Sequence, residues 1–295
     1  MTRERPDREL VSVIIPARNA AATIEAQLEA LSQQTYPDPW EIVVVDNGST
    51  DGTDQVVRAW QQRLPHLRMA NAPQARGVNY ARNVGCRSSR GELLLFCDAD
   101  DIVDVNWLAA MVEGLQDYDA VGGQLERVSL NNPVAVAARP PKWTNTLPDT
   151  FSFLPYPFAA NCGVRKKVWS ALNGFDPGYQ FGSDDVEFFW RAQLAGYEVG
   201  FIPGAIVHYR LRATVHSMAR QYYYYGKSHT RLYRDFSAHG MPPSRFRESW
   251  REWRWLATHS FDLCHSPTAR GIWLTKLALR LGRIAGSIRN RTLYL

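Results

Sequence analysis

Short apolar runs alternate with helical segments over residues 10–97, and this alternation restricts the chain to few architectures. Four runs rich in aliphatic and β-branched residues are LVSVII (10–15), WEIVVV (40–45), a weaker HLRMA (66–70) and ELLLFC (92–97). Between them, apolar residues recur at helical spacing: Ile24, Leu28 and Leu31, then Val56, Val57, Trp60 and Leu64, then a shorter segment over 78–88. Continuous apolar strands joined by helices form a parallel sheet covered on both faces. The sequence therefore predicts an α/β fold.

Three polar loops follow these strands, and a parallel sheet delivers such loops to the same edge, where ligands bind. The loops are PARN (16–19), DNGSTDGTD (46–54) and DADD (98–101). No G-x-G-x-x-G follows the first apolar run, and no G-x-x-x-x-G-K-[ST] occurs in the chain. A dinucleotide-binding fold and a P-loop are therefore disfavoured.

The loop DADD places three carboxylates within four residues, directly after a strand. Unpaired carboxylates this close together repel one another, so they need a positive partner or open water. Asp98 and Asp100 could bind one divalent cation together with substrate phosphates. The alternative is that these residues only form a turn or cap a helix.

Charge is segregated along the chain. Residues 1–209 hold 18 Lys and Arg against 25 Asp and Glu, a net charge of −7, whereas residues 210–295 hold 16 against 4, a net charge of +12. The two values sum to the overall +5. The basic C-terminal part is expected to face an anionic surface or polymer.

The four cysteines indicate neither disulfides nor a zinc site, because none forms a C-x-x-C pair. Reduced thiols are typical of cytosolic proteins. No apolar run approaches the roughly 18 residues that a membrane span needs. We expect a cytoplasmic protein that is soluble, or peripheral on the cytoplasmic face of the membrane.

The order of the motifs resembles family 2 glycosyltransferases with the GT-A nucleotide-sugar fold. The first four motifs are PARN, VVVDNGSTDGT, ARNVG (81–85) and LLLFCDADD. Three later segments continue the resemblance: FAANCGVRKKVWSALNGFD (158–176), FGSDDVEFFWRAQLAGYEV (181–199) and IVHYR (206–210). The resemblance covers residues 10–210 and weakens beyond.

The resemblance implies a GT-A, Rossmann-like catalytic domain over residues 1–210, with a mostly parallel sheet flanked by helices. Residues 10–100 would form its nucleotide-binding half and residues 101–210 its acceptor-binding half. Residues 211–295 would form a helical, basic C-terminal region.

The resemblance also assigns the donor site. Asp46 matches the acid that hydrogen-bonds the nucleotide base, with Pro16, Ala17 and Asn19 lining that pocket. Arg76 or Arg82 would add positive charge there, and the sequence does not choose between them.

The D-x-D motif of the family falls on Asp98 and Asp100. Asp98 would lie near the ribose, Asp100 would bind Mg²⁺ or Mn²⁺, and Asp101 would be a neighbour. His208 matches a histidine that completes the metal site in several relatives. Its alternative is a strand-end histidine bonded to backbone.

A second acidic cluster, in GSDDVEF, matches the family position that usually reads Glu-Asp and supplies the general base. The base then falls on Asp185. Because Asp184 stands in place of the usual Glu, Asp184 remains a second candidate. Both residues are expected at a helix N-terminus, where simple capping is the alternative role.

These residues predict a metal-assisted inverting glycosyltransferase, a hexosyltransferase-like enzyme. The cation stabilises the leaving diphosphate, and a carboxylate on the opposite face takes the proton from the acceptor hydroxyl. The acceptor would be a glycan, a lipid-linked sugar or a small molecule, as in polysaccharide biosynthesis. The rivals are a sugar nucleotidyltransferase and a catalytically silent nucleotide-sugar-binding protein. Nucleic acid is not expected as a partner, since acids in the loops would repel a phosphate backbone.

Two further segments have open interpretations. Residues 131–158 carry Trp143, Phe151, Phe153 and Tyr156, which either stack on acceptor sugars or bury one another in an irregular loop. In the tail, Trp273, Leu277, Leu281, Ile284 and Ile288 share one helical face, and Lys276, Arg280 and Arg283 share another. Such a basic amphipathic helix binds an anionic membrane surface, docks on the catalytic domain or forms an oligomer contact. The oligomeric state is not predicted.

Overall fold

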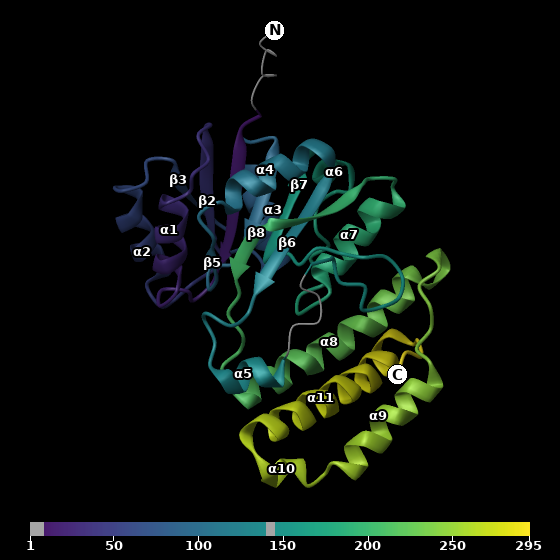
Figure 1. Cartoon of the computed structure of the whole chain (residues 1–295). Coiled ribbons are helices and arrows are strands. Elements are labelled where there is room, and N and C mark those ends of the chain that lie inside the picture. Colours follow the sequence, from purple (N-terminus) through teal and green to yellow (C-terminus); the bar gives the residue numbers. More distant parts are fainter. Residues whose placement is uncertain (1–8, 140–144) are drawn as a thin grey trace.

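The computed structural model describes residues 9–139 and 145–295. One sheet of eight strands forms the centre of the molecule, in the order β3-β2-β1-β4-β7-β6-β8-β5 (Figure 1). The strands are β1 (Val11–Ala17), β2 (Trp40–Asp46), β3 (Leu67–Asn71), β4 (Leu93–Cys97), β5 (Ile102–Val103), β6 (Ala120–Glu126), β7 (Asn161–Arg165) and β8 (Val199–His208).

The first half of the sheet is parallel throughout, as the apolar runs predict. β1 pairs in parallel with β2 and β4, and β2 pairs in parallel with β3. Helices α1 (Ile24–Ser32), α2 (Thr53–Gln61) and α3 (Val78–Ser88) connect these strands. The carboxyl ends of β1, β2 and β4, with the loops that follow them, therefore lie at one edge of the sheet.

Both faces of this sheet are buried, and residues alternate between them along each strand. In β1, Val13 and Ile15 pack into a core with α1, α2 and α4 (Trp107–Asp117). Ile14, between them, packs into a second core on the other face, with α3, α6 (Lys166–Ala171) and α7 (Asp184–Leu194). This explains why the strands read as continuous apolar runs and not as alternating ones.

The second half of the sheet is mixed. β7 is antiparallel to β4 and to β6, β8 is parallel to β6, and β5 is antiparallel to β8. Four of the seven strand pairings in the sheet are thus parallel. Because β7 is reversed against both of its neighbours, β6 and β8 run in the same direction as β4. The carboxyl ends of β4, β6 and β8 consequently meet at one edge.

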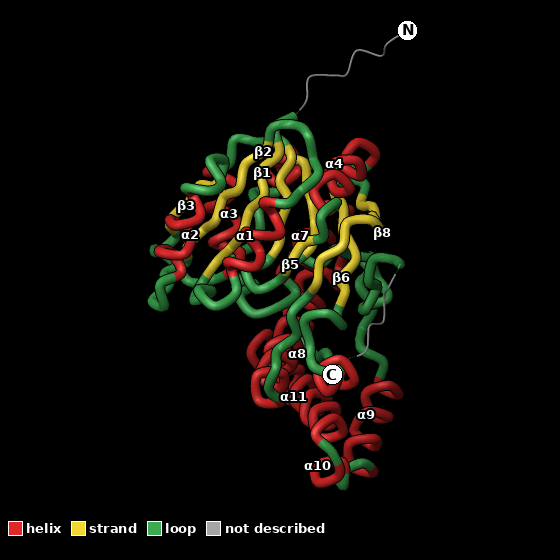
Figure 2. Tube along the Cα trace, turned by 60° about the vertical axis from the view of Figure 1, so that its left-hand side comes forward, coloured by secondary structure: helices red, strands yellow, loops and turns green. Residues whose placement is uncertain are grey.

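Helices form the region after β8 and lie beyond that edge of the sheet (Figures 1 and 2). They are α8 (Val215–Phe236), a single 3₁₀ turn η1 (Ser237–His239), α9 (Phe246–Thr258), the short α10 (Asp262–His265) and α11 (Pro267–Asn290). A further short helix, α5 (Pro133–Ala138), lies beside them. Among the described residues, no helix is both long enough and apolar enough to cross a membrane.

Glycines bring α11 close to α8. A Cβ on Gly226 of α8 would lie 2.2 Å from the carbonyl oxygen of Leu279, and one on Gly282 of α11 would lie 2.0 Å from that of Tyr223. The face of α11 that docks on α8 is therefore its small-residue face. The apolar stripe identified in the sequence is left partly outside, with Leu281, Ile284 and Ile288 exposed. Intramolecular docking and an exposed apolar stripe coexist on this helix.

Candidate active site

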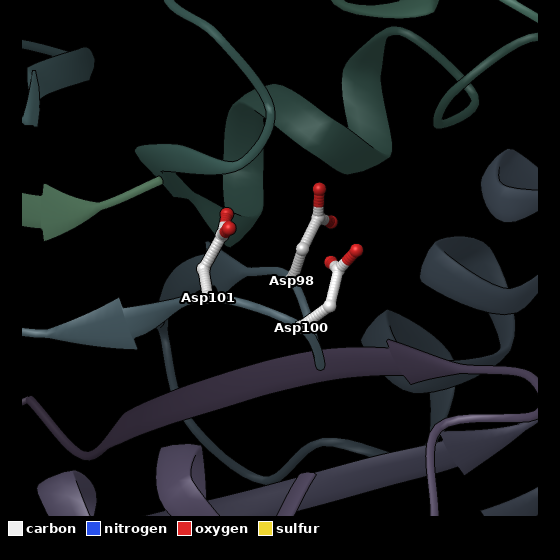
Figure 3. Close-up of side chains that lie close together, drawn as sticks. All are labelled: Asp98, Asp100 and Asp101. Carbon is white, nitrogen blue, oxygen red and sulfur yellow. The ribbon is translucent and has the colours of Figure 1, made fainter. Parts of the chain in front are cut away.

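Three aspartates lie together in the loop after β4. One carboxylate oxygen from each of Asp98, Asp100 and Asp101 lies within 4.8 Å of the others. Their carboxylates project to the same side of the loop (Figure 3). The group is close enough to surround one cation.

The burial of Asp98 and Asp101 disfavours their charged forms. Burial raises the pKa of Asp98 to about 6, and the charge of Arg82 opposes that rise. Burial also raises the pKa of Asp101, and the charges of Asp98 and Asp100 add to it. Asp101 Oδ1 accepts the backbone N–H of Arg210 at 2.7 Å, whereas its buried Oδ2 has no partner among the described atoms. Crowded carboxylates with an unsatisfied buried oxygen are stabilised by a bound cation.

Arg82 joins this group to the second acidic cluster. Its side chain is 4% exposed, with Nη2 3.5 Å from Asp98 Oδ1 and Nη1 2.5 Å from Asp184 Oδ2. Arg76, the other candidate, is exposed on the loop before α3. The structure therefore places Arg82, and not Arg76, between the two predicted sets of acids, which share one site.

Asp185 lies in the first turn of α7, which begins at Asp184 as the sequence predicts. Asp185 Oδ1 accepts the N–H of Val186 at 2.8 Å, and Oδ2 accepts the N–H of Ala159 at 3.4 Å. Burial raises the pKa of Asp185 to about 7, with Asp184 as the next cause. Such a group can exchange a proton near neutral pH.

The turn before α7 depends on a glycine. Gly182 has φ 137°, and a Cβ there would lie 2.5 Å from the ring of Tyr225 on α8. The next residue, Ser183, has φ 57°, and its hydroxyl lies 2.8 Å from that of Ser228 on α8. Helix α8 thus supports the backbone that presents Asp184 and Asp185.

The residues predicted to bind the nucleotide gather at the ends of β1 and β2. Ala17 pairs with Asp46 in register, next to Pro16. Asn19, at φ 52°, donates its backbone N–H to Ser49 Oγ at 2.9 Å. Its Oδ1 accepts the N–H of Thr50, also at 2.9 Å. Asp46 accepts the Ser49 N–H at 3.2 Å within its own loop, and the two Asn19 contacts join this loop to the one after β1.

His208 ends β8, and its neighbour in register is Ile102 of β5. Its Nδ1 lies 3.0 Å from Glu126 Oε2, at the end of β6. Within the described chain, the group of three aspartates does not include His208. The histidine therefore has a carboxylate partner in place of the backbone contact considered from the sequence.

Sequence reasoning missed four residues at this edge. Glu126 was identifiable only from its position at a strand end; burial raises its pKa, but hydrogen bonds from Ser129 and His208 outweigh this and lower the pKa to about 2. Arg212 Nη1 lies 3.4 Å from Asp100 Oδ2, and Arg210 Nε donates to the Asp100 carbonyl at 2.8 Å. Ala159, which donates to Asp185, carries no polar side chain, so no signal marked it.

The four described aromatics of residues 131–158 are all at least partly buried, two of them fully. Phe151 and Tyr156 are buried, and the ring of Phe153 packs edge-on against Trp190 of α7. Trp143 lies outside the described residues. Residues 133–138 of this segment form helix α5, and the irregular part after the described gap packs on α7.

The three aspartates fit a divalent metal ion, because hard cations such as Mg²⁺ and Mn²⁺ prefer carboxylate oxygens. The raised pKa values of Asp98 and Asp101 are what an arrangement of crowded, buried carboxylates produces before a cation is added. The group of carboxylate oxygens includes Asp98 and Asp100, the two residues to which the sequence assigns the metal.

Comparisons with known proteins give the family. The model of "Glycosyl transferase family 2" matches residues 12–169, and that of "Glycosyl transferase family group 2" matches residues 93–286. Glycosyltransferase AglE of Haloferax volcanii is 34% identical over 195 residues, which are 65% of this chain and 64% of that protein. The Escherichia coli UDP-Glc:alpha-D-GlcNAc-diphosphoundecaprenol beta-1,3-glucosyltransferase WfgD is 30% identical over 140 residues, 47% of this chain and 54% of that protein. The matched segment spans less than two thirds of either relative.

A solved structure gives the fold. Mannosyltransferase PcManGT from Pyrobaculum calidifontis, in complex with GDP-Man and Mn²⁺, is similar at a TM-score of 0.66 and 21% identity. The similarity covers 95% of this chain and 88% of that one. The expected GT-A fold, with its sheet flanked by helices, is confirmed. Since the first family model covers more than half of the chain, the chain belongs to glycosyltransferase family 2.

Proposed function

We propose that this protein is an inverting glycosyltransferase that moves a sugar from a nucleoside-diphosphate sugar to an acceptor hydroxyl. The observation that carries the proposal is the contact of Arg82 with both Asp98 and Asp184. This contact places the three aspartates that could bind a cation in the same site as the Asp184–Asp185 pair, which could accept a proton. Transfer with inversion needs these two chemistries on opposite sides of the anomeric carbon.

In this proposal the donor lies along the ends of β1, β2 and β4. Asp46 accepts a hydrogen bond from the base, beside Pro16, Ala17 and Asn19, and Asp98 lies near the ribose. Asp100, with Asp98, holds Mg²⁺ or Mn²⁺, and His208 lies next to the same loop, in register with Ile102. The cation, when bound, neutralises charge on the leaving diphosphate. The support is the carboxylate group itself, together with the GDP-Man and Mn²⁺ bound by the similar mannosyltransferase.

Asp185 acts as the general base in this proposal. Its carboxylate takes the proton of the acceptor hydroxyl while the sugar moves to that oxygen. Arg82 holds Asp184 and positions the turn, so Asp184 has a partner that Asp185 lacks. This difference favours Asp185 over Asp184 as the base.

The division of labour follows from these positions. Residues 10–100 would bind the nucleotide, residues 101–210 the acceptor, and residues 211–295 would contribute helical support and a basic surface. The acceptor is proposed to be a lipid-linked sugar in glycan or polysaccharide assembly. The name of WfgD, with its diphosphoundecaprenol acceptor, motivates that choice.

The C-terminal helices are proposed to rest on an anionic membrane surface. Phe246 and Trp250 of α9 are 82% and 62% exposed, and Ile288 of α11 is 75% exposed. Arg247, Arg251 and Arg254 line a hollow of about 330 Å³ with the two aromatics. α9 runs antiparallel to α11, since Leu256 bonds to Trp273 near one end and Ser244 to Leu295 near the other. Exposed apolar and cationic side chains at one end of this pair are the composition of an interfacial surface.

Sedimentation with vesicles tests the membrane proposal. We expect binding to vesicles of phosphatidylcholine and phosphatidylglycerol, and its loss in a double variant of Phe246→Ser and Trp250→Ser. Leu194→Ser, which alters an exposed apolar residue on α7, is the control and should bind normally. Wild type that ignores anionic vesicles would rule out the membrane contact.

A thermal-shift screen tests the transferase proposal. UDP-, GDP- and dTDP-sugars are compared with and without Mn²⁺, because a ligand that binds only the folded state raises Tm. We expect one nucleotide class to raise Tm only when Mn²⁺ is present. That donor should then be hydrolysed slowly or transferred. Stabilisation without hydrolysis or transfer would indicate a silent binding protein, and no stabilisation by any donor would overturn the proposal.

A further inference from the structure

Two arginines near the predicted acceptor side have no acidic partner in the part of the chain that the structure describes. Arg127 directly follows β6, and Arg139 directly follows α5. Both side chains are partly buried, and neither guanidinium forms an ion pair with a described acid. Buried charges are ordinarily paired, because an uncompensated one is costly.

Arg127 is the more unusual of the two. Its guanidinium carbon lies 5.8 Å from the ring centre of Phe158 and 5.9 Å from that of Tyr209. Its buried Nε has no hydrogen-bond partner in the described structure. Aromatic faces attract a cation but accept no strong hydrogen bond. The N–H groups of the Arg127 guanidinium therefore remain free to donate to a ligand.

Arg139 lies near enough to Arg127 to repel it. Burial lowers the pKa of Arg127, and the charge of Arg139 lowers it further. Arg139 itself donates from Nη1 to Gln221 Oε1 at 3.0 Å and lies 5.3 Å from the ring centre of Tyr222. Both partners of Arg139 belong to α8, and neither is negatively charged. The pair therefore concentrates positive charge between the end of β6 and α8.

Other arginines with little exposure have acidic neighbours, which Arg127 and Arg139 lack among the described residues. Arg82 contacts two aspartates, Arg191 pairs with Glu187, and Arg231 pairs with Asp176. Arg280 and Arg283 of α11 also have a buried Nε without a hydrogen-bond partner in the described structure, but the charges of Glu248 and Glu252 of α9 raise the pKa of both arginines against the effect of burial. For Arg127 and Arg139 the nearby groups are tyrosines.

The arginine pair borders Asp185 along two routes. The ring of Phe158, which faces Arg127, belongs to the residue before Ala159, whose N–H donates to Asp185. Tyr222, next to Arg139, lies 5.8 Å ring to ring from Tyr225. Tyr225 in turn packs against Gly182 in the turn before Asp184. The pair thus lies on the side of Asp185 that borders β6 and α8, away from the nucleotide-binding ends of β1 and β2.

We propose that Arg127 and Arg139 bind a phosphate or diphosphate group carried by the acceptor. Guanidinium forks match phosphate oxygens in pairs of hydrogen bonds and form their strongest contacts with such anions. The inference rests on the proposed function, because Asp185 as base defines the acceptor side. It adds the chemical class of the acceptor: a sugar or alcohol bearing an anionic phosphate near the reacting hydroxyl.

Inorganic pyrophosphate is the probe for this site. The donor site is first filled with Mn²⁺ and the nucleoside diphosphate that raises Tm, and pyrophosphate is then titrated by calorimetry. We expect saturable binding, weakened at least about tenfold in Arg127→Gln and in Arg139→Gln, since each removes one charged fork. Arg127→Lys should recover part of the affinity. Arg63→Gln, which alters an arginine stacked on Trp60 in the α2 region, is the matched control and should bind as wild type does.

Two further measurements separate ligand binding from a structural role. Removing an uncompensated cation should leave Tm unchanged or raise it, whereas a structural arginine would lower Tm when replaced. Nucleoside diphosphate affinity should stay within about twofold of wild type in both Gln variants. An equal loss of nucleotide affinity would assign the arginines to the donor and overturn the proposal.

Titration with farnesyl diphosphate shows whether the bound phosphate belongs to a lipid headgroup or to a soluble acceptor. Binding tighter than pyrophosphate by about tenfold or more would identify a lipid headgroup, and equal binding a soluble phosphorylated acceptor. Absent pyrophosphate binding to the nucleotide-loaded protein would overturn the arginine site alone. Failure of nucleotide and Mn²⁺ to bind would instead overturn the transferase proposal, so the two failures are distinct.

Discussion

The two carboxylate groups that Arg82 connects differ in how their charge is balanced. After β4, Asp98, Asp100 and Asp101 face Arg82, Arg212 and the N–H of Arg210. At the start of α7, the donors to Asp185 among the described residues are two backbone N–H groups, and Asp184 adds a like charge beside it.

This difference separates two kinds of chemistry. The β4 loop brings three carboxylates within 4.8 Å of one another, which suits a divalent cation. Asp185 is a single buried carboxyl with its pKa near 7, which suits a proton. Substitutions can remove the proton-exchanging carboxyl, the cation-binding carboxylates or the arginine that lies between them, and each should have a different effect.

Asp185→Asn should have the largest effect. Removing the base is expected to lower turnover by about 10²- to 10⁴-fold while leaving Mn²⁺-dependent donor binding unchanged. Turnover is measured with a radiolabelled donor, and binding by thermal shift. Asp184→Asn is the matched variant, and a greater loss there would transfer the base role to Asp184.

Asp100→Asn should act on the other side of the contrast. We expect Mn²⁺-dependent donor affinity to fall by about 10- to 100-fold, because an amide replaces a charged ligand oxygen. Calorimetric titration of the donor at several Mn²⁺ concentrations measures it. Asp104→Asn alters an aspartate outside this group of three and should bind the donor with wild-type affinity. If the affinity of Asp100→Asn were unchanged, Asp100 would not be a metal ligand.

Arg82→Gln should lower activity by about tenfold, because glutamine has neither the charge nor the planar fork that contacts Asp98 and Asp184 together. Since the charge of Arg82 lowers the pKa of both Asp98 and Asp185, the pH at which activity is half-maximal should move upward when that charge is removed. Activity measured from about pH 5.5 to 9 shows the shift; an unmoved profile would mean that Arg82 has no electrostatic influence on the base.

The pH dependence of the wild type should show the smallest effect. The base works as a carboxylate, and burial raises its pKa to about 7, so kcat should fall as the pH falls through 7. At saturating Mn²⁺ and donor, we expect about half of the plateau rate at pH 7. A profile that is flat down to about pH 5 would contradict this role for a buried Asp185.

The parallel half of the sheet could be predicted from the sequence because burial on both faces leaves a direct mark. Every residue of β4 is buried, and its run reads LLLFC. The later strands have shorter or less apolar sequences, so they are harder to recognise. β7 reads NCGVR and β5 has two residues, so their antiparallel pairing depends on contacts distant in sequence.

The site could be predicted in part for the same reason. Strand ends in a parallel sheet converge, so Asp46 and Asp98 could be placed together from their positions alone. The choice of Arg82 over Arg76 could not, because it depends on which side of α3 faces Asp184. Nor does helical periodicity show which face of α11 packs on α8, since glycines form that contact and part of the apolar stripe stays exposed.

The contact of Tyr225 with Gly182 makes the helical region part of the active-site wall. Leu232 and Phe236 of α8, Met241 and Tyr294 belong to the same hydrophobic core as the second face of the sheet. A fragment ending at residue 210 would expose that core and leave the turn before Asp184 without its support. Catalytic competence in this chain is therefore expected to require residues far beyond the last strand, and the helices cannot be exchanged as an independent module.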